Sequence, residues 1–157
     1  MSDRDTIRHF LATLNYRLRG VVRDAPKSFY TYLPAGDGRS AVEIIHHVND
    51  LLRFVVRAFD KGSIVPMSPT EPEAELSTFG KLLEIVDMHL QKSELTGDVK
   101  GRALTLHVLL QGPLADAMTH VGQLAQLRRQ AGSPVAYENY MRSEERRVGK
   151  ECTVLCR

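Results

Sequence analysis

The stretch Gly112–Gly132, GPLADAMTHVGQLAQLRRQAG, decides the fold that we expect for this chain. Apolar residues recur along it at helical spacing, and Gly132 followed by Pro134 is the usual signal for the end of a helix. The pattern therefore predicts an amphipathic helix. Its apolar positions are Leu114, Ala117, Val121, Leu124 and Leu127.

Two polar residues interrupt the face of this helix that should be buried. Asp116 and His120 lie four positions apart, in line with Leu124, so their side chains stack on one side of the helix. A buried carboxylate or imidazole is costly unless it has a partner, and a metal ion would be a partner for both. The pair therefore indicates a site. An ion pair between the two side chains is an alternative explanation that needs no metal.

Three more amphipathic helices are expected before this one. Apolar residues repeat at three- and four-residue spacings over residues 2–24, 40–60 and 76–90. Ser40 with Glu43 forms a capping box at the start of the second of these. Four such helices without strand-like alternation predict an all-α fold, an antiparallel four-helix bundle.

The connections are less regular than the helices. Residues 63–73 carry three prolines and few apolar residues, so we expect a loop that runs over the bundle. Residues 102–111 could form a short separate helix. We expect them instead to continue into the last helix with a kink at Pro113, because an internal proline removes a backbone hydrogen bond.

Two adjacent histidines lie in the helix expected over residues 40–60. His47 shares the apolar stripe with Leu51, whereas His46 groups with Asp50 and Arg53 on a face that is solvated by composition. Successive helix positions differ by about 100° around the axis, so the two rings cannot both face the bundle interior. We therefore expect His47 to point inward and His46 to point elsewhere.

Helical bundles build metal sites from side chains on facing helices, and His47 would face the helix that carries Asp116 and His120. Two imidazoles and one carboxylate suit zinc, nickel, iron or manganese and leave coordination positions open. A single histidine on an apolar stripe is more often a satisfied core residue. Gln123, one turn beyond His120, is placed to act on a bound ligand as a catalytic residue, although a solvated glutamine is the commoner case.

The motifs HHVND (46–50), DAMTHVGQL (116–124) and LRRQAGSP (127–134) resemble the DinB/YfiT-like superfamily. Its members are four-helix bundles with a metal held by one histidine of helix two and two residues four apart on the last helix. The resemblance spans most of residues 1–140. It implies His47, Asp116 and His120 as ligands, with zinc or nickel as the metal. Asp116 stands where the family commonly has histidine, which adds negative charge.

Family members with known activities look like metal-dependent thiol transferases that use low-molecular-weight thiols such as bacillithiol or mycothiol, or like hydrolases or isomerases. The resemblance therefore implies a small-molecule substrate and a nucleophile activated by a metal, as in a thiol S-transferase or a hydrolase. The alternative is a non-catalytic helical bundle, without metal, that binds a small ligand or forms a dimer through an apolar face. We expect a homodimer.

Composition narrows the classes of partner and location. The formal net charge of +2 gives no sign of a nucleic-acid footprint. No apolar run approaches the roughly 20 residues that cross a bilayer, so we expect no membrane partner and a cytoplasmic location. The two cysteines, Cys152 and Cys156, lie among the last residues and offer the fold neither a disulfide framework nor a cysteine zinc site.

The sequence of 157 residues predicts one domain followed by a short tail. We expect residues 1–140 to form one DinB-like domain, which is long enough to bury a core. Residues 141–157 are expected to be a non-native or disordered tail, because RSEERRVGKEC at 142–152 resembles the translation of a common sequencing adapter. A genuine basic, solvated tail is the alternative.

Overall fold

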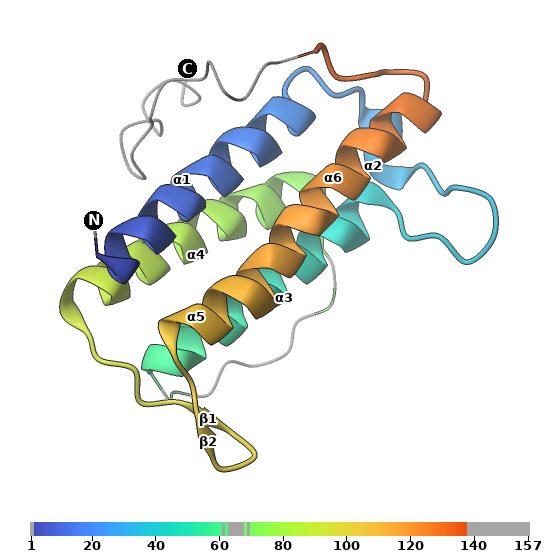
Figure 1. Ribbon diagram of the computed structural model, residues 1–157. Helices are drawn as coiled ribbons and strands as arrows, with labels where there is room; N and C mark the ends of the chain where they lie inside the picture. The colour runs from blue at the N-terminus through green and yellow to red at the C-terminus, as the bar shows by residue number, and fades with distance from the viewer. Residues whose placement is uncertain (1, 61, 63–67, 69, 138–157) are drawn as a thin grey trace.

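The structure, a computed structural model, describes residues 2–60, 62, 68 and 70–137 (Figure 1). Most of the loop expected over 63–73 and the whole tail expected over 141–157 lie outside these residues. The described part of the chain is mostly helical, with one hairpin of two very short strands. The expected all-α class is therefore confirmed.

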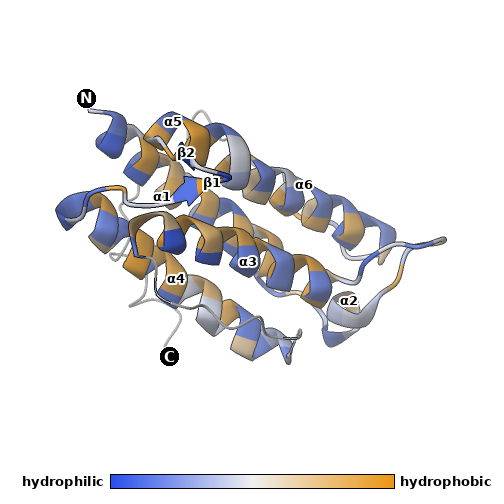
Figure 2. Cartoon of the chain, turned by 90° about the horizontal axis from the view of Figure 1, so that it is seen from below, coloured by the Kyte–Doolittle hydropathy of each residue, from blue (hydrophilic) through white to orange (hydrophobic). Residues whose placement is uncertain are grey.

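Four long helices make up most of the described chain: α1 (Asp3–Val22), α3 (Ala41–Phe59), α4 (Pro72–Lys92) and α6 (Ala115–Gln130). Helices α1 and α3 each pack against both α4 and α6 (Figure 1). Their hydrophobic positions gather on the sides turned toward one another (Figure 2). The helices predicted over residues 2–24, 40–60 and 76–90 are confirmed to within a few residues, apart from the earlier start of α4.

The expected capping box of α3 is confirmed. Ser40 Oγ accepts a hydrogen bond from the backbone N–H of Glu43, and the Glu43 carboxylate accepts one from the backbone N–H of Ser40 at 2.7 Å. This reciprocal pairing satisfies donors that the helix itself leaves without partners. It begins α3 six residues before His47, and so fixes where on the helix the histidine pair lies.

The last helix contains the expected irregularity at Pro113. Helix α5 (Leu106–Leu109) leads into a π-helical turn, η1 (Leu110–Leu114), which leads directly into α6. Proline lacks the N–H that a regular helix needs at this position, and the wider turn accommodates that loss. The chain is therefore continuous from Leu106 to Gln130, as expected, and Asp116 follows the irregular turn by two residues.

Two short elements were not expected from the sequence. Helix α2 (Lys27–Thr31) places Phe29 fully in the core, and strands β1 (Asp98–Val99) and β2 (Arg102–Ala103) form a hairpin. The hairpin is joined to the end of α3, because the backbone N–H groups of Thr96 and Gly97 both donate to Ala58 O at 2.9 Å. A Cβ atom at Gly97 would lie 2.8 Å from the Cα of Ala58, so this close approach requires glycine.

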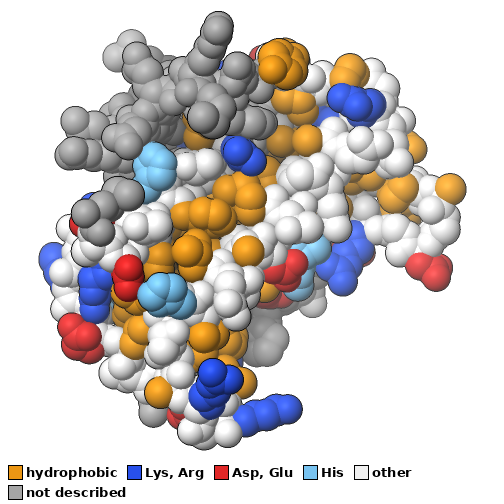
Figure 3. Space-filling view, in the orientation of Figure 1, with side chains coloured by type: hydrophobic (Ala, Val, Ile, Leu, Met, Phe, Trp, Pro, Cys, Tyr) orange, Lys and Arg blue, Asp and Glu red, His pale blue; other side chains and the backbone are white. Residues whose placement is uncertain are grey.

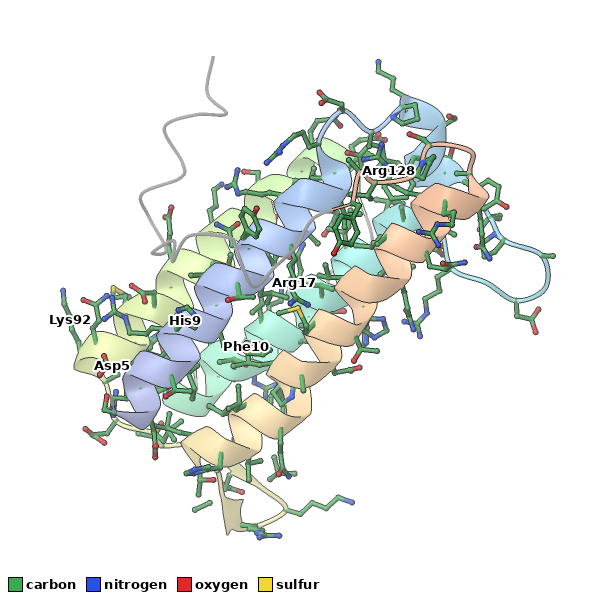
Figure 4. The ribbon with its side chains drawn as sticks, turned by 45° about the horizontal axis from the view of Figure 1, so that its top comes forward. Asp5, His9, Phe10, Arg17, Lys92 and Arg128 are labelled. Atoms are coloured by element: carbon green, nitrogen blue, oxygen red, sulfur yellow. The ribbon has the colours of Figure 1, made fainter. Side chains whose placement is uncertain are left out.

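Arg128 joins the far end of α6 to α1 and α2. Its side chain is buried and donates hydrogen bonds to Val21 O (2.6 Å), Arg23 O (2.9 Å) and Ser133 O (2.8 Å). The guanidinium also lies over the ring of Phe29, 5.8 Å from its centroid. Arg128 therefore lies where the ends of three helices meet (Figure 4). Because it satisfies carbonyls at the C-terminal end of α1, those of Val21 and the capping residue Arg23, it fixes α6 against that helix.

The expectation of a solvated face around His46 holds for Asp50, which is exposed, but is wrong for the rest of that face. His46, Asn49 and Arg53 are all buried. The Glu75 carboxylate, 3% exposed on α4, accepts hydrogen bonds from His46 Nδ1 (3.1 Å) and Asn49 Nδ2 (2.7 Å). It also accepts them from the backbone N–H and the hydroxyl of Thr70 at 3.0 and 2.9 Å. The first turn of α4 covers this face, and Glu75 is the shared acceptor of its donors, whereas the amide oxygen of Asn49 is buried without a hydrogen bond to any described residue.

No helix in the described ranges has both the length and the apolar character that crossing a bilayer requires.

We predict that Glu75→Gln lowers the free energy of unfolding by about 1–3 kcal/mol near pH 7, because a buried acceptor of charge-assisted hydrogen bonds is lost. Burial by itself would raise the pKa of Glu75, but the hydrogen bonds from Thr70, Asn49 and His46 bring it below the ordinary 4.5. A lowered pKa in the folded state stabilises the protein above the unfolded pKa, and this stabilisation is lost as pH falls through the folded value. The difference between wild type and variant should therefore shrink below about pH 4.5.

Urea unfolding across a pH series measures this difference. Glu73→Gln is the matched control, because Glu73 is exposed in the same turn of α4. If both variants lose the same stability, or if the loss for Glu75→Gln stays constant down to acidic pH, the assigned role of the Glu75 carboxylate is wrong.

Candidate metal centre

Three predicted site residues meet between α3 and α6. His47 Nε2 lies 3.8 Å from Asp116 Oδ2, and His120 Nε2 lies 3.4 Å from Asp116 Oδ1. The two imidazole rings meet edge to face, with centroids 4.6 Å apart and planes at 89°. One ligand atom from each residue lies within 4.8 Å of the other two. His47 points toward Asp116 and His120, as predicted. The expectation that His47 rather than His46 faces the interior is wrong, because the His47 side chain is 34% exposed and that of His46 only 9%. Metal binding stays a prediction.

The two adjacent histidines separate because α3 packs against α4 on one side and α6 on the other. His46 bonds to Glu75 of α4, while the next residue, His47, turns about 100° further round the helix and reaches Asp116 of α6. The hydrogen bond between His46 and Glu75 therefore also sets the direction in which His47 points.

The expectation that Asp116 lies on a buried face is wrong. The Asp116 side chain is 49% exposed, against 34% for His47 and 13% for His120. On α6 the fully buried positions include Ala117 and Leu124, and Asp116 falls on the flank of that stripe rather than at its centre. The free-energy cost of burying the Asp116 carboxylate is therefore no argument for a metal. The alternative of a buried ion pair does not describe Asp116 either.

The stronger argument for a cation comes from His120. Its Nδ1 lies 2.7 Å from the amide oxygen of Gln123, which can only accept, so this contact is a hydrogen bond in the tautomer that carries its proton on Nδ1. In a neutral imidazole this leaves a lone pair on Nε2, the atom that lies 3.4 Å from Asp116 Oδ1. Two acceptors then face each other. Either a proton on Nε2 or a cation between the two groups would satisfy both.

The environment of His47 favours the neutral ring. Burial lowers the pKa of His47 below the ordinary 6.5, and positive charge on His120 and Arg39 lowers it further. The carboxylates of Asp116 and Asp50 act in the opposite direction but do not outweigh these causes. A metal binds the neutral imidazole, so His47 is ready to act as a ligand near neutral pH.

Two grooves open onto the three residues. The first, of about 540 Å³, contains His47 and His120 in its walls and is rich in polar side chains, among them Arg39 and Gln123. The second, of about 600 Å³, contains Asp116 in its wall. Its other walls are mostly apolar or small: Leu51, Phe54, Gly112, Pro113 and Ala115. Both grooves expose a mixture of polar and apolar surface, and molecules can approach the three residues from two sides.

Gln123 is exposed, lines the first groove and contacts His120. A side chain that orients a histidine through its second nitrogen is the usual companion of a metal-binding imidazole. The contact makes Gln123 a positioning residue for His120. Its predicted catalytic role remains a prediction.

No match to this chain was found among protein-family models, curated proteins or solved structures. The resemblance to the DinB/YfiT-like superfamily therefore rests on the motifs themselves and on the placement of their residues.

Sequence reasoning missed Arg39 as part of the site. Arg39 immediately precedes Ser40, the capping residue of the helix that carries His47. A cation at the start of that helix is the one local signal that could have indicated its position near the groove. The apolar wall of the second groove could not be found this way, because Phe54 and Pro113 are far apart in the chain.

We predict that Asp116→Asn lowers the pKa of His47 further in chelator-treated protein, because it removes one of the negative charges that stabilise the imidazolium. The shifts of the His47 ring protons in an NMR pH titration measure this change. Asp98→Asn, in the exposed hairpin, serves as the control and should leave the titration unchanged. A rise in the pKa of His47 in Asp116→Asn would contradict the geometry described here.

Proposed function

We propose that this chain is a metal-dependent enzyme of the DinB/YfiT-like type, built as an antiparallel four-helix bundle, that acts as a thiol S-transferase or a hydrolase. The observation that carries the proposal is the meeting of two histidine Nε2 atoms with the Asp116 carboxylate. The hydrogen bond from His120 Nδ1 to Gln123 supports it, because that bond directs Nε2 toward the other two residues.

The three side chains fit a divalent cation. Ligands held about 2.1 Å from a tetrahedral ion lie roughly 3.4 Å from one another. The distances from Asp116 to His120 and His47, 3.4 and 3.8 Å, reach different oxygens of the carboxylate. One ligand atom from each residue lies within 4.8 Å of the others, so the side chains would move closer together to share one ion. Two imidazoles with one carboxylate suit zinc or nickel best, with iron or manganese possible, and three protein ligands leave a position open.

A divalent metal at these residues would supply a Lewis acid, which lowers the pKa of a thiol or water that it binds. The chain contributes orientation and charge. Gln123 holds the ring of His120, burial keeps His47 neutral, and the carboxylate of Asp116 offsets part of the positive charge. Because Asp116 and His47 are partly exposed, a small-molecule substrate can reach the site directly.

Two separate grooves that reach the same three residues favour transfer over hydrolysis. In S-transfer the thiol sulfur forms a bond to an electrophilic carbon, the bond from that carbon to its leaving group breaks, and the thiol proton leaves with that group. This reaction needs two organic substrates at one centre, whereas hydrolysis needs one substrate and water. A low-molecular-weight thiol could occupy one groove and an apolar electrophile the other.

The remaining parts of this proposal follow the same family resemblance. The order of the long helices α1, α3, α4 and α6 agrees with a four-helix bundle, in which the ligands come from the second and last long helices. The absence of a helix able to cross a bilayer among the described residues agrees with a cytoplasmic location.

A non-catalytic bundle is the second candidate. An apolar strip runs along the surface between α1 and α6 (Figure 3). Half-buried apolar side chains from these helices and from α5 and η1 lie beside the core: Phe10, Leu106, Leu110 and Met118. Such a strip is typical of a face that binds a second copy of the chain, so a homodimer stays a prediction under both candidates.

We predict that purified protein grown with added zinc and nickel carries about one divalent metal per chain and that His120→Ala abolishes this binding. Metal analysis by mass spectrometry measures the content. His107→Ala is the control, because His107 is exposed on α5 outside the site. Wild-type protein that contains no metal after such growth would rule out the metal-dependent enzyme.

We predict that a chelator lowers the melting temperature of wild-type protein, because a ligand bound only by the native state adds stability by mass action, about 2.7 kcal/mol at a hundred times its Kd. In His47→Ala the chelator should have no effect. If the chelator leaves wild type unchanged and His47→Ala melts like wild type, the non-catalytic candidate is favoured.

A further inference from the structure

The groove beside His47 and His120 has a distinct chemistry along its length. Arg39 lines it on the side of the loop before α3, and the amides of Gln123, Gln126 and Gln130 line it from α6. Apolar side chains, including Ile44 and Leu127, complete the walls. The groove therefore combines one cation, a row of neutral amides and the candidate metal ligands.

The guanidinium of Arg39 is not held in place by the fold. Among the residues that the structure describes, it makes no hydrogen bond or ion pair, and its side chain is exposed. Its charge acts on Glu43 and His47 only through space. The nearby carboxylate of Glu43 already accepts from the backbone N–H and hydroxyl of Ser40, at 2.7 and 2.6 Å. Arg39 can therefore present its planar set of donors to an anion in the groove.

The three glutamines follow one another at positions separated by three and four residues, so they form a single row along α6. The amide oxygen of Gln123 is engaged by His120, whereas Gln126 and Gln130 have no hydrogen bond to any described residue. Amides both donate and accept, so this wall suits a ligand that carries amide or hydroxyl groups.

We propose that this groove binds a small molecule with a carboxylate at one end and amide or hydroxyl groups along its length, with the carboxylate on Arg39 and the other end at His47 and His120. The reaction at that end rests on the function proposed above, but binding of the carboxylate does not. A single guanidinium balances one negative charge, which favours a carboxylate over a phosphate dianion. The second groove has no cationic side chain in its wall and would not take this ligand.

N-Acetylglycine tests the proposal, because it contains one amide and one carboxylate. Its titration into chelator-treated protein is followed by the NMR signals of the side-chain amides of Gln126 and Gln130. We expect saturable shifts in wild type. In Arg39→Gln the dissociation constant should be at least about tenfold higher, because a charge-assisted hydrogen-bonded pair is lost. Arg129→Gln is the matched control, since Arg129 is exposed on α6, the helix of Gln126 and Gln130, but lies outside the groove. This substitution should leave binding unchanged.

Three results would overturn the proposal: no saturable shift, equal binding by wild type and Arg39→Gln, or equal binding of the neutral N-acetylglycinamide. Tighter binding of inorganic phosphate than of N-acetylglycine would also overturn it, since the groove would then select a different anion. The metal analysis decides the proposed function separately. If the protein contains metal but does not bind N-acetylglycine saturably, only the inference about the groove is wrong. If it binds N-acetylglycine but contains no metal, only the proposed metal-dependent enzyme is wrong.

Discussion

The buried carboxylate of Glu75 is the constraint on which the arrangement of α3 depends. A buried charge is tolerated only when hydrogen bonds surround it, and here the donors are His46, Asn49 and Thr70. These donors reach Glu75 in only one rotation of α3 against α4. Apolar packing alone would tolerate small rotations, because neighbouring aliphatic side chains can exchange contacts. The direction of His47 therefore follows from a polar contact on the opposite side of its helix.

Helix α6 is fixed by a comparable device at its far end. Arg128 donates to carbonyl groups at the C-terminal end of α1, and its planar guanidinium offers several donors at once. At the near end, the π-helical turn at Pro113 sets where the regular helix begins. The two helices that carry the candidate ligands are thus each positioned by groups outside the site, which leaves His47, Asp116 and His120 free of any need to hold the fold together.

The spacing of residues within one segment predicted the features that depend on that segment alone. Helix positions, the Ser40 cap, the irregularity at Pro113 and the separation of His46 from His47 all follow from spacing within one segment. The errors concern contacts between segments. His46 and Glu75 are 29 positions apart, and a set of polar residues that satisfy one another has the same composition as a solvated face. The helices were therefore predictable, whereas what covers each polar face was not.

Asp116 and His120 are neighbours because they lie one turn apart on α6, so the contact between them does not depend on how α3 packs. When Nδ1 of His120 donates to the amide oxygen of Gln123, the neutral ring keeps its lone pair on Nε2, 3.4 Å from Asp116 Oδ1. Helix α3 adds His47, whose Nε2 lies 3.8 Å from the other oxygen of the same carboxylate. A divalent cation would lie among groups that all offer lone pairs, and the environment of His47 favours the neutral ring that such a cation binds.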